Sequence, residues 1–113
     1  MNKELQAELV SDLIDAAGYG INWAVEAVQD DAAQTYTLTL DEDAAEEAGK
    51  SEVVVTYAQI RTAIRKIAKG GVLNPVLTSS AKDFVFRPDE ADLDSDFADA
   101  AIQIAVFGEV VFG

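Results

Sequence analysis

Apolar residues recur along this chain at two spacings, and each spacing predicts one kind of element. Residues 2–17 carry apolar side chains three and four positions apart, with acidic residues off that stripe, which predicts an amphipathic helix. Asn2 is suited to cap its start, and Gly18 is suited to end it. A second helix is predicted to open at Thr56, because Thr56 and Gln59 have the spacing of a capping box. The stripe expected to be buried in that helix consists of Ile60, Ala63, Ile64 and Ile67.

Alternation with a period of two predicts three strands between these helices. They cover residues 21–28, 35–40 and 52–55. Polar residues 29–34 form the turn of an antiparallel hairpin, and residues 41–51 form a charged connection to the third strand. The side chains expected to share one side are Ile21, Trp23, Val25 and Ala27 in the first strand, and those expected to face inward in the second are Tyr36, Leu38 and Leu40.

The pattern in the last third of the chain is less regular. Residues 83–86 are consistent with either a short strand or an apolar plug. Asp94 or Ser95 is suited to cap a third helix that runs to about Phe107. The order α-β-β-β-α-(loop)-α predicts a single α+β domain over residues 1–113, in which about three helices pack on one face of a small antiparallel three-stranded sheet.

Charge narrows the classes of function. The chain has 8 Lys and Arg residues against 21 Asp and Glu residues, so its formal net charge is -13. A field of that sign repels polyanions, which excludes a general nucleic-acid-binding protein. The chain has no cysteine and no histidine, which excludes disulfides, thiolate metal sites and a thiol nucleophile. The absence of histidine removes the commonest general base near neutral pH and the commonest zinc ligand.

No segment of the sequence is expected to act as a signal peptide or to span a membrane. Residues 1–15 are interrupted by acids and lack the apolar run of a signal peptide. Residues 100–112 form the most apolar stretch, but it is too short to span a bilayer and contains Glu109. We therefore expect a cytoplasmic protein with no membrane partner. The acid excess is also typical of proteins adapted to very high salt, and the sequence leaves that alternative open.

Two segments carry motifs. Residues 16–23 read AAGYGINW, a helix end that runs through a glycine-aromatic turn into a strand, and residues 99–113 read DAAIQIAVFGEVVFG. Together they resemble a group of small uncharacterised phage and prophage proteins, in which a Gly-Gly-x-x-Tyr-Trp-like segment follows the first helix and a Gln-x-x-x-Phe-Gly-Glu-Ile/Val-Val-Tyr-Gly end closes the chain. Two positions depart from that pattern, because Tyr19 lies further from Trp23 and Phe112 stands where the group has Tyr. The resemblance implies a viral or mobile-element origin and implies no reaction.

The acidic residues form dense runs that predict a protein-binding face. Carboxylates along a rigid surface can imitate a nucleic-acid backbone and steer a basic partner onto it. The residues predicted to form this acidic face are Asp41, Glu42, Asp43, Glu46, Glu47, Asp89, Glu90, Asp92, Asp94 and Asp96. The alternative is a solvated surface whose acids stabilise the N-terminus of the third helix. A calcium loop starting at Asp92 is not expected, because Phe97 stands where it needs Gly and Gln103 stands where it needs Glu.

Half of the basic residues fall on the second predicted helix. Arg61, Arg65 and Lys69 recur every four residues on its polar side, with Lys66 beside them. They predict either a local anion site, for a nucleotide phosphate with Tyr19 as the exposed aromatic, or a charged face paired with neighbouring acids.

We therefore expect a non-catalytic binding protein. The leading hypothesis is a phage-type counter-defence or host-modulating protein whose acidic face occupies a basic, nucleic-acid-binding host protein. The alternatives are a binder that sequesters a nucleotide-like ligand, an enzyme that uses carboxylates and a divalent cation, and a salt-adapted domain. No catalytic residue, cofactor or resident metal is predicted, because nothing marks one pair among 21 acids. The apolar end at residues 110–112 is expected to be covered either by homo-oligomerisation or by folding over the chain's own sheet.

Overall fold

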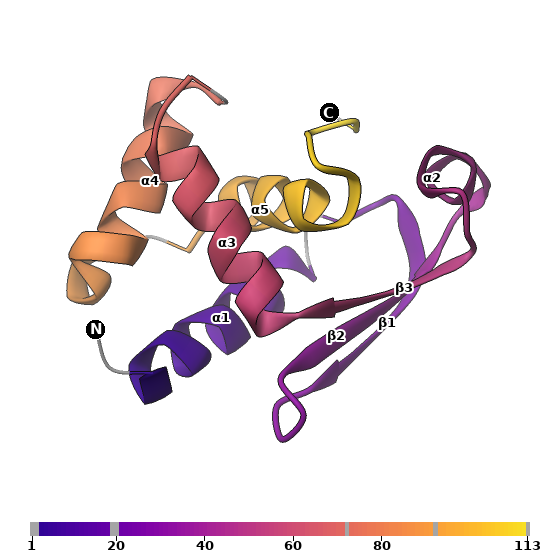
Figure 1. Ribbon diagram of the computed structural model, residues 1–113, viewed down its shortest axis with the longest axis horizontal. Helices are drawn as coiled ribbons and strands as arrows, with labels where there is room; N and C mark the ends of the chain where they lie inside the picture. The colour runs from indigo at the N-terminus through magenta and orange to yellow at the C-terminus, as the bar shows by residue number, and fades with distance from the viewer. Residues whose placement is uncertain (1–2, 19–20, 72, 92, 113) are drawn as a thin grey trace.

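Figure 1 shows the computed structural model, in which α1, α3, α4 and α5 gather on one side of a short sheet. The structure describes residues 3–18, 21–71, 73–91 and 93–112. Its elements in chain order are α1 (Lys3–Ala17), β1 (Ala24–Asp30), β2 (Thr35–Leu40), α2 (Glu42–Ala48), β3 (Glu52–Thr56), α3 (Tyr57–Ala68), α4 (Pro75–Phe86), the 3-10 turn η1 (Pro88–Glu90) and α5 (Ser95–Phe107). The α+β class and the antiparallel three-stranded sheet are confirmed, while the described helices are more numerous than the sequence predicted.

The sheet has the order β1-β2-β3, and both strand pairs are antiparallel. Tyr36, Leu38 and Leu40 of β2 are buried, as their alternation predicts. Val53 and Val55 of β3 are also buried and lie opposite Leu38 and Tyr36. Because opposite residues of antiparallel strands share a face, these five side chains form the floor on which the helices pack.

Helix α3 is the centre of the helical layer and packs against both α4 and α5. Its predicted stripe of isoleucines and one alanine is buried. The predicted capping box is present: Thr56 Oγ1 accepts from the Gln59 amide at 3.1 Å, and Gln59 Oε1 accepts from the Thr56 amide at 2.8 Å. The next amide, that of Tyr57, donates to the Gln34 carbonyl at 2.9 Å. The start of α3 is thereby fixed beside the hairpin turn.

The predicted charged connection at residues 41–51 is wrong, because it contains the helix α2. Asp41 caps this helix, its Oδ1 accepting from the Ala44 amide at 2.8 Å. Ala44 is fully buried, and Gly49 ends the helix in the left-handed region with a φ of 76°. A helix this short buries too few side chains to produce a visible helical period.

The segment at residues 83–86 is neither a strand nor a plug, because it is the last turn of α4. Asn74 caps α4, accepting from the Leu77 amide at 2.9 Å, and Pro75 occupies a first-turn position that suits its fixed φ. The buried residues of the helix are Ser80, Ala81 and Phe84. Two of the three are small, so the buried face of α4 does not show as a hydrophobic stripe.

Strand β1 begins at Ala24 instead of Ile21. A bulge between Ala24 and Glu26 shifts its register against β2. Val25 is consequently 71% exposed while Trp23 is 1% exposed, so the prediction that they share one side is wrong. A bulge inserts one extra residue and breaks the period of two, which is the only signal that the sequence pattern offers.

The C-terminal segment folds back onto the chain itself. Gln103 is fully buried, and its Oε1 accepts from the amides of Val111 at 2.9 Å and Phe112 at 2.8 Å. Its Nε2 donates to the Phe112 carbonyl at 2.8 Å and to Asp99 Oδ2 at 3.1 Å. Of the two covers predicted for the apolar end, the structure therefore shows an intramolecular one, built on α5 in place of the sheet.

Trp23 completes this cluster from the other end of the chain. Its Nε1 donates to Asp99 Oδ1 at 2.7 Å. Its ring lies edge-on to Phe107, with centroids 5.3 Å apart, and stacks on Phe112 at 6.4 Å. Trp23 and residues 99–112, far apart in the sequence, thus meet in one place, where they hold the C-terminal segment against the core.

Candidate functional site

The described acidic residues predicted to form one face lie at three places in the fold. Five belong to α2 and its cap, at the right of Figure 1. Asp89 and Glu90 belong to η1, which packs against α4 at the left of Figure 1. Asp94 and Asp96 lie at the start of α5, and Asp92 lies outside the described residues. In Figure 1, α2 and α4, against which η1 packs, lie at opposite sides of the molecule.

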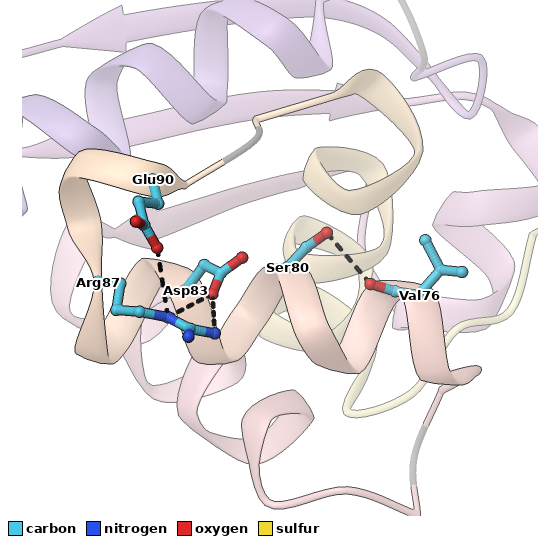
Figure 2. A network of polar contacts seen from close by, with 5 residues as sticks. All are labelled: Val76, Ser80, Asp83, Arg87 and Glu90. Atoms are coloured by element: carbon cyan, nitrogen blue, oxygen red, sulfur yellow. Dashed lines mark hydrogen bonds and ion pairs between the residues drawn. The ribbon is translucent and has the colours of Figure 1, made fainter.

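Some of these carboxylates have structural partners. Asp94 caps α5, accepting from the Phe97 amide at 2.8 Å, as Asp41 does for α2. Figure 2 shows Arg87 at the end of α4, between Asp83 and Glu90. The Arg87 guanidinium donates to Asp83 Oδ1 at 2.5 and 2.9 Å, and its Nε lies 3.6 Å from Glu90 Oε2. The charge of Glu90 is therefore partly neutralised within the chain.

The predicted cations lie along α3, but Tyr19, the aromatic expected beside them, lies outside the described residues. No described carboxylate oxygen lies within 4.0 Å of Arg61, Arg65 or Lys69. The predicted pairing with neighbouring acids is therefore not found in the described part of the chain. Arg65 and Lys69 flank a shallow hollow between α3 and α4. The other residues that line this hollow are Ala68, Val85 and Phe86.

A site that the sequence analysis did not find lies between α1 and the turn of the hairpin. Glu8, Ser11 and Asp12 lie within about one turn of each other on α1. Asp31 joins them from the β1–β2 turn, and Tyr57 joins them from the start of α3. Together with Ala7 these residues line an open hollow of about 370 Å³, which we call the hairpin groove.

Polar contacts hold the hairpin groove together. Gln29 Nε2 lies 2.8 Å from Ser11 Oγ, 2.8 Å from Asp31 Oδ1 and 3.1 Å from the Tyr57 hydroxyl oxygen. Its two hydrogens are therefore shared among three acceptors. The Tyr57 hydroxyl donates to Asp31 Oδ1. The network connects α1, β1, the hairpin turn and α3, so it fixes the Asp31 carboxylate relative to the helical layer.

The same contacts set the charge states of the groove. The hydrogen bond from Tyr57, with a further one from Gln29, holds the pKa of Asp31 below its ordinary value. Burial raises the pKa of Tyr57, and its hydrogen bond to Asp31 raises that pKa further. Asp31 therefore stays ionised and Tyr57 stays protonated near neutral pH. A general acid or base works best with a pKa near the operating pH, so the pair is better suited to binding a cation than to transferring a proton.

Replacing Tyr57 by phenylalanine is expected to raise the pKa of Asp31 toward its ordinary value, because the variant lacks the donor that contributes most to lowering it. A depressed carboxyl pKa contributes stability above the unfolded-state pKa and loses it as the pH falls through the folded-state value. The variant should therefore lose less stability on acidification. An NMR titration of the Asp31 side-chain carboxyl measures the shift, with Tyr36→Phe as the matched control. An unchanged Asp31 pKa in Tyr57→Phe would contradict this account.

Three further findings bear on function. Among the described residues, no group of three or more carboxylates could hold a metal ion. The longest described helix, α1, has 15 residues, and none of the described helices combines the length and apolar character needed to cross a membrane. Comparison with protein-family models, with curated proteins and with solved structures returns no match for this chain. The resemblance to phage proteins stays a prediction.

Proposed function

We propose that this protein acts by binding a basic protein partner through the carboxylates of the hairpin groove. The partner would be a nucleic-acid-binding protein, with the carboxylates taking the place of phosphates on its basic surface. If the phage-type resemblance holds, that partner is a protein of the host. The proposal keeps the acidic-surface hypothesis of the sequence analysis but moves its centre from α2 and η1 to α1 and the hairpin turn.

The observation that carries the proposal is that, among the side chains the structure describes, no cation lies beside the groove carboxylates. Glu8, Asp12 and Asp31 line the hairpin groove, and none of its lining residues is basic. Across the described residues, the ion pairs are those of Arg87 with Asp83 and Glu90, which lie on α4 and η1. Uncompensated charge in a concave surface concentrates the field and accelerates the approach of a partner of opposite charge.

The carboxylate row continues along α1 beyond the groove. Glu8 and Asp12 are four residues apart, which is about 6 Å along a helix. Asp15, about one turn after Asp12, borders a second hollow together with Gln29 and Tyr36. Burial raises the pKa of Tyr36, and the charge of Asp15 raises it further. A row of charges on a rigid helix is preorganised, so a basic segment lying along α1 would meet it without reordering the chain.

The proposal is tested by capturing proteins from a host-cell extract on the immobilised chain. Captured proteins are expected to be basic, to be released by added double-stranded DNA or RNA, and to be lost steeply as salt rises above about 0.15 M, because exposed charge is screened. The double variant Glu8→Gln/Asp12→Asn should reduce capture at least tenfold, on the order of 1.4 kcal/mol for two charge contacts.

The matched control is Glu46→Gln/Glu47→Gln, which removes the same charge from α2. This control should retain most of the capture. Equal loss in both double variants would mean that overall charge and not the groove drives binding, and the proposal would be wrong. Capture that nucleic acid does not compete, or that survives high salt unchanged, would also overturn it.

A further inference from the structure

The hollow between α3 and α4 has an apolar floor and a cationic rim. Ala68, Val85 and Phe86 supply apolar surface, and Arg65 and Lys69 stand beside it; we call these five residues the cationic groove. Phe86 is 75% exposed, although an aromatic ring of this size is usually buried. Exposed aromatic surface beside cations is typical of a place where another molecule docks.

The rim cations have no acidic partner among the described side chains, so they are placed to meet an external partner. Neither Arg65 nor Lys69 has a described carboxylate oxygen within 4.0 Å, in a chain with 21 acidic residues. Their spacing of four residues places them about 6 Å apart along α3, on one side of the helix. The occupant must therefore present carboxylates next to apolar side chains.

The outer face of the sheet has that composition. Val28, Thr37 and Val54 lie opposite one another across the three strands, on the face away from the buried floor. Both valines are 56% exposed. Glu26 and Glu52 lie opposite Thr39 in the neighbouring row of the same face. The acidic apolar face thus formed by Val28, Thr37, Val54, Glu26 and Glu52 is called the outer sheet face.

We propose that the cationic groove binds the outer sheet face of a second copy of this chain, with Phe86 against Val28 and Val54 and with Arg65 and Lys69 against Glu26 and Glu52. Figure 1 places α4 and the sheet at opposite ends of the molecule, so one chain cannot bring its own two surfaces together. The contact is therefore heterologous, and copies associate head to tail into rings or open chains.

The net charge opposes this association only at long range. Two copies of formal charge -13 repel each other, and this repulsion dominates at low ionic strength. At about 0.15 M salt, charges more than about 8 Å apart are largely screened, while close pairs at a desolvated contact are screened much less. The association is therefore expected near physiological salt and is expected to weaken on dilution into low salt.

A second copy fits this groove better than a small anion does. Apart from Arg65 and Lys69, every lining residue is an apolar Ala, Val or Phe, so the groove supplies no hydroxyl or amide side chain to orient a phosphate or a base. A row of valine and threonine next to a row that carries two carboxylates matches both the exposed ring and the two cations.

Sedimentation equilibrium at about 0.15 M salt tests the proposal. The weight-average mass of the wild-type chain should rise with concentration above the monomer value of 12.1 kDa. Two double variants should each stay at the monomer mass. Arg65→Glu/Lys69→Glu removes the cations of the groove, and Val28→Glu/Val54→Glu disrupts the outer sheet face. An equimolar mixture of the two should form a dimer of twice that mass and nothing larger, because exactly one intact contact remains.

Controls separate the contact from charge and from misfolding. Lys50→Glu, in the turn before β3, reverses one charge, as does the single variant Lys69→Glu; Lys50→Glu should associate as the wild type does, whereas Lys69→Glu should associate more weakly. Far-ultraviolet circular dichroism confirms that each variant is folded. If a sheet variant does not fold, Glu26→Gln/Glu52→Gln replaces it and should weaken association at least tenfold.

Three outcomes would overturn the proposal. The wild-type chain could stay at the monomer mass at every concentration, or both spoiled variants could associate as the wild type does. The third is that ATP raises the melting temperature of the monomer and Arg65→Glu abolishes that shift, which would make the groove a small-molecule site. The test is independent of the hairpin groove, because none of these variants alters α1, the hairpin turn or Tyr57.

Discussion

Replacing Trp23 by alanine is expected to lower the free energy of unfolding by about 4 kcal/mol, the middle of the range for a buried aromatic truncated to alanine. The side chain is 1% exposed, so the variant leaves a cavity beside Phe107 and Phe112. It also removes the indole donor that lies 2.7 Å from Asp99 Oδ1. Both losses fall on the place where the C-terminal segment is held. Urea denaturation followed by circular dichroism measures the change, because the variant lacks the chain's only tryptophan.

Val25→Ala is the matched control for this prediction. Val25 is two residues away and 71% exposed, so its truncation should change stability by no more than about 0.5 kcal/mol. Trp23→Phe keeps most of the packing but lacks the hydrogen-bond donor, so its loss of unfolding free energy should lie between those of Trp23→Ala and Val25→Ala. If Trp23→Ala and Val25→Ala lower the free energy of unfolding equally, Trp23 does not hold the C-terminal cluster together.

The sequence predicted best those parts of the fold whose signal is local. The capping box of Thr56 and Gln59, the cap at Asp94 and the inward alternation of β2 are confirmed, because each depends on residues only a few positions apart. The elements it missed lack such a signal. Helix α2 has a single buried residue, Ala44, and two of the three buried residues of α4 are small, so neither helix shows an apolar stripe.

The candidate site was harder to predict because it is built across the chain. Glu8 and Asp12 could be placed on the polar side of an amphipathic helix from the sequence alone. Nothing local indicates that Asp31, in a polar turn, faces them, or that Tyr57 meets Asp31 across 26 positions. The acids were visible, but which of them converge depends on the tertiary fold.

The two sequence motifs, at residues 16–23 and 99–113, include residues with a structural use in this chain. Trp23 comes from one motif and Gln103 and Phe112 from the other, and all three contribute to one cluster. Phe112 stacks on Trp23, and this contact needs the aromatic ring but no hydroxyl. The motif residues thus account for how the C-terminal segment is fixed, whereas the surfaces proposed to bind partners lie elsewhere on the molecule.

Gln103→Met is expected to lower the free energy of unfolding by about 3 kcal/mol. The substitution keeps the size of a fully buried side chain but removes all of its hydrogen bonds, namely those to the amides of Val111 and Phe112, to the Phe112 carbonyl and to Asp99. Each neutral hydrogen bond contributes roughly 1 kcal/mol, and a donor or acceptor left buried without a partner costs about as much or more. The C-terminal segment can limit that cost only by moving its amides out to water.

That movement gives the variant a second signature. When the C-terminal segment leaves, Phe112 no longer stacks on Trp23, so the fluorescence of Trp23 should shift to longer wavelength before global unfolding. Ile104→Met is the matched control, because it puts the same side chain at a neighbouring buried position that makes no side-chain hydrogen bond, and it should cost less than about 1.5 kcal/mol. If Gln103→Met is no more destabilising than Ile104→Met, or leaves the Trp23 emission unchanged, the buried amide is not what holds the end of the chain. A loss confined to Gln103→Met would instead show that four hydrogen bonds from one side chain, and not apolar contact alone, keep the apolar end folded onto its own chain.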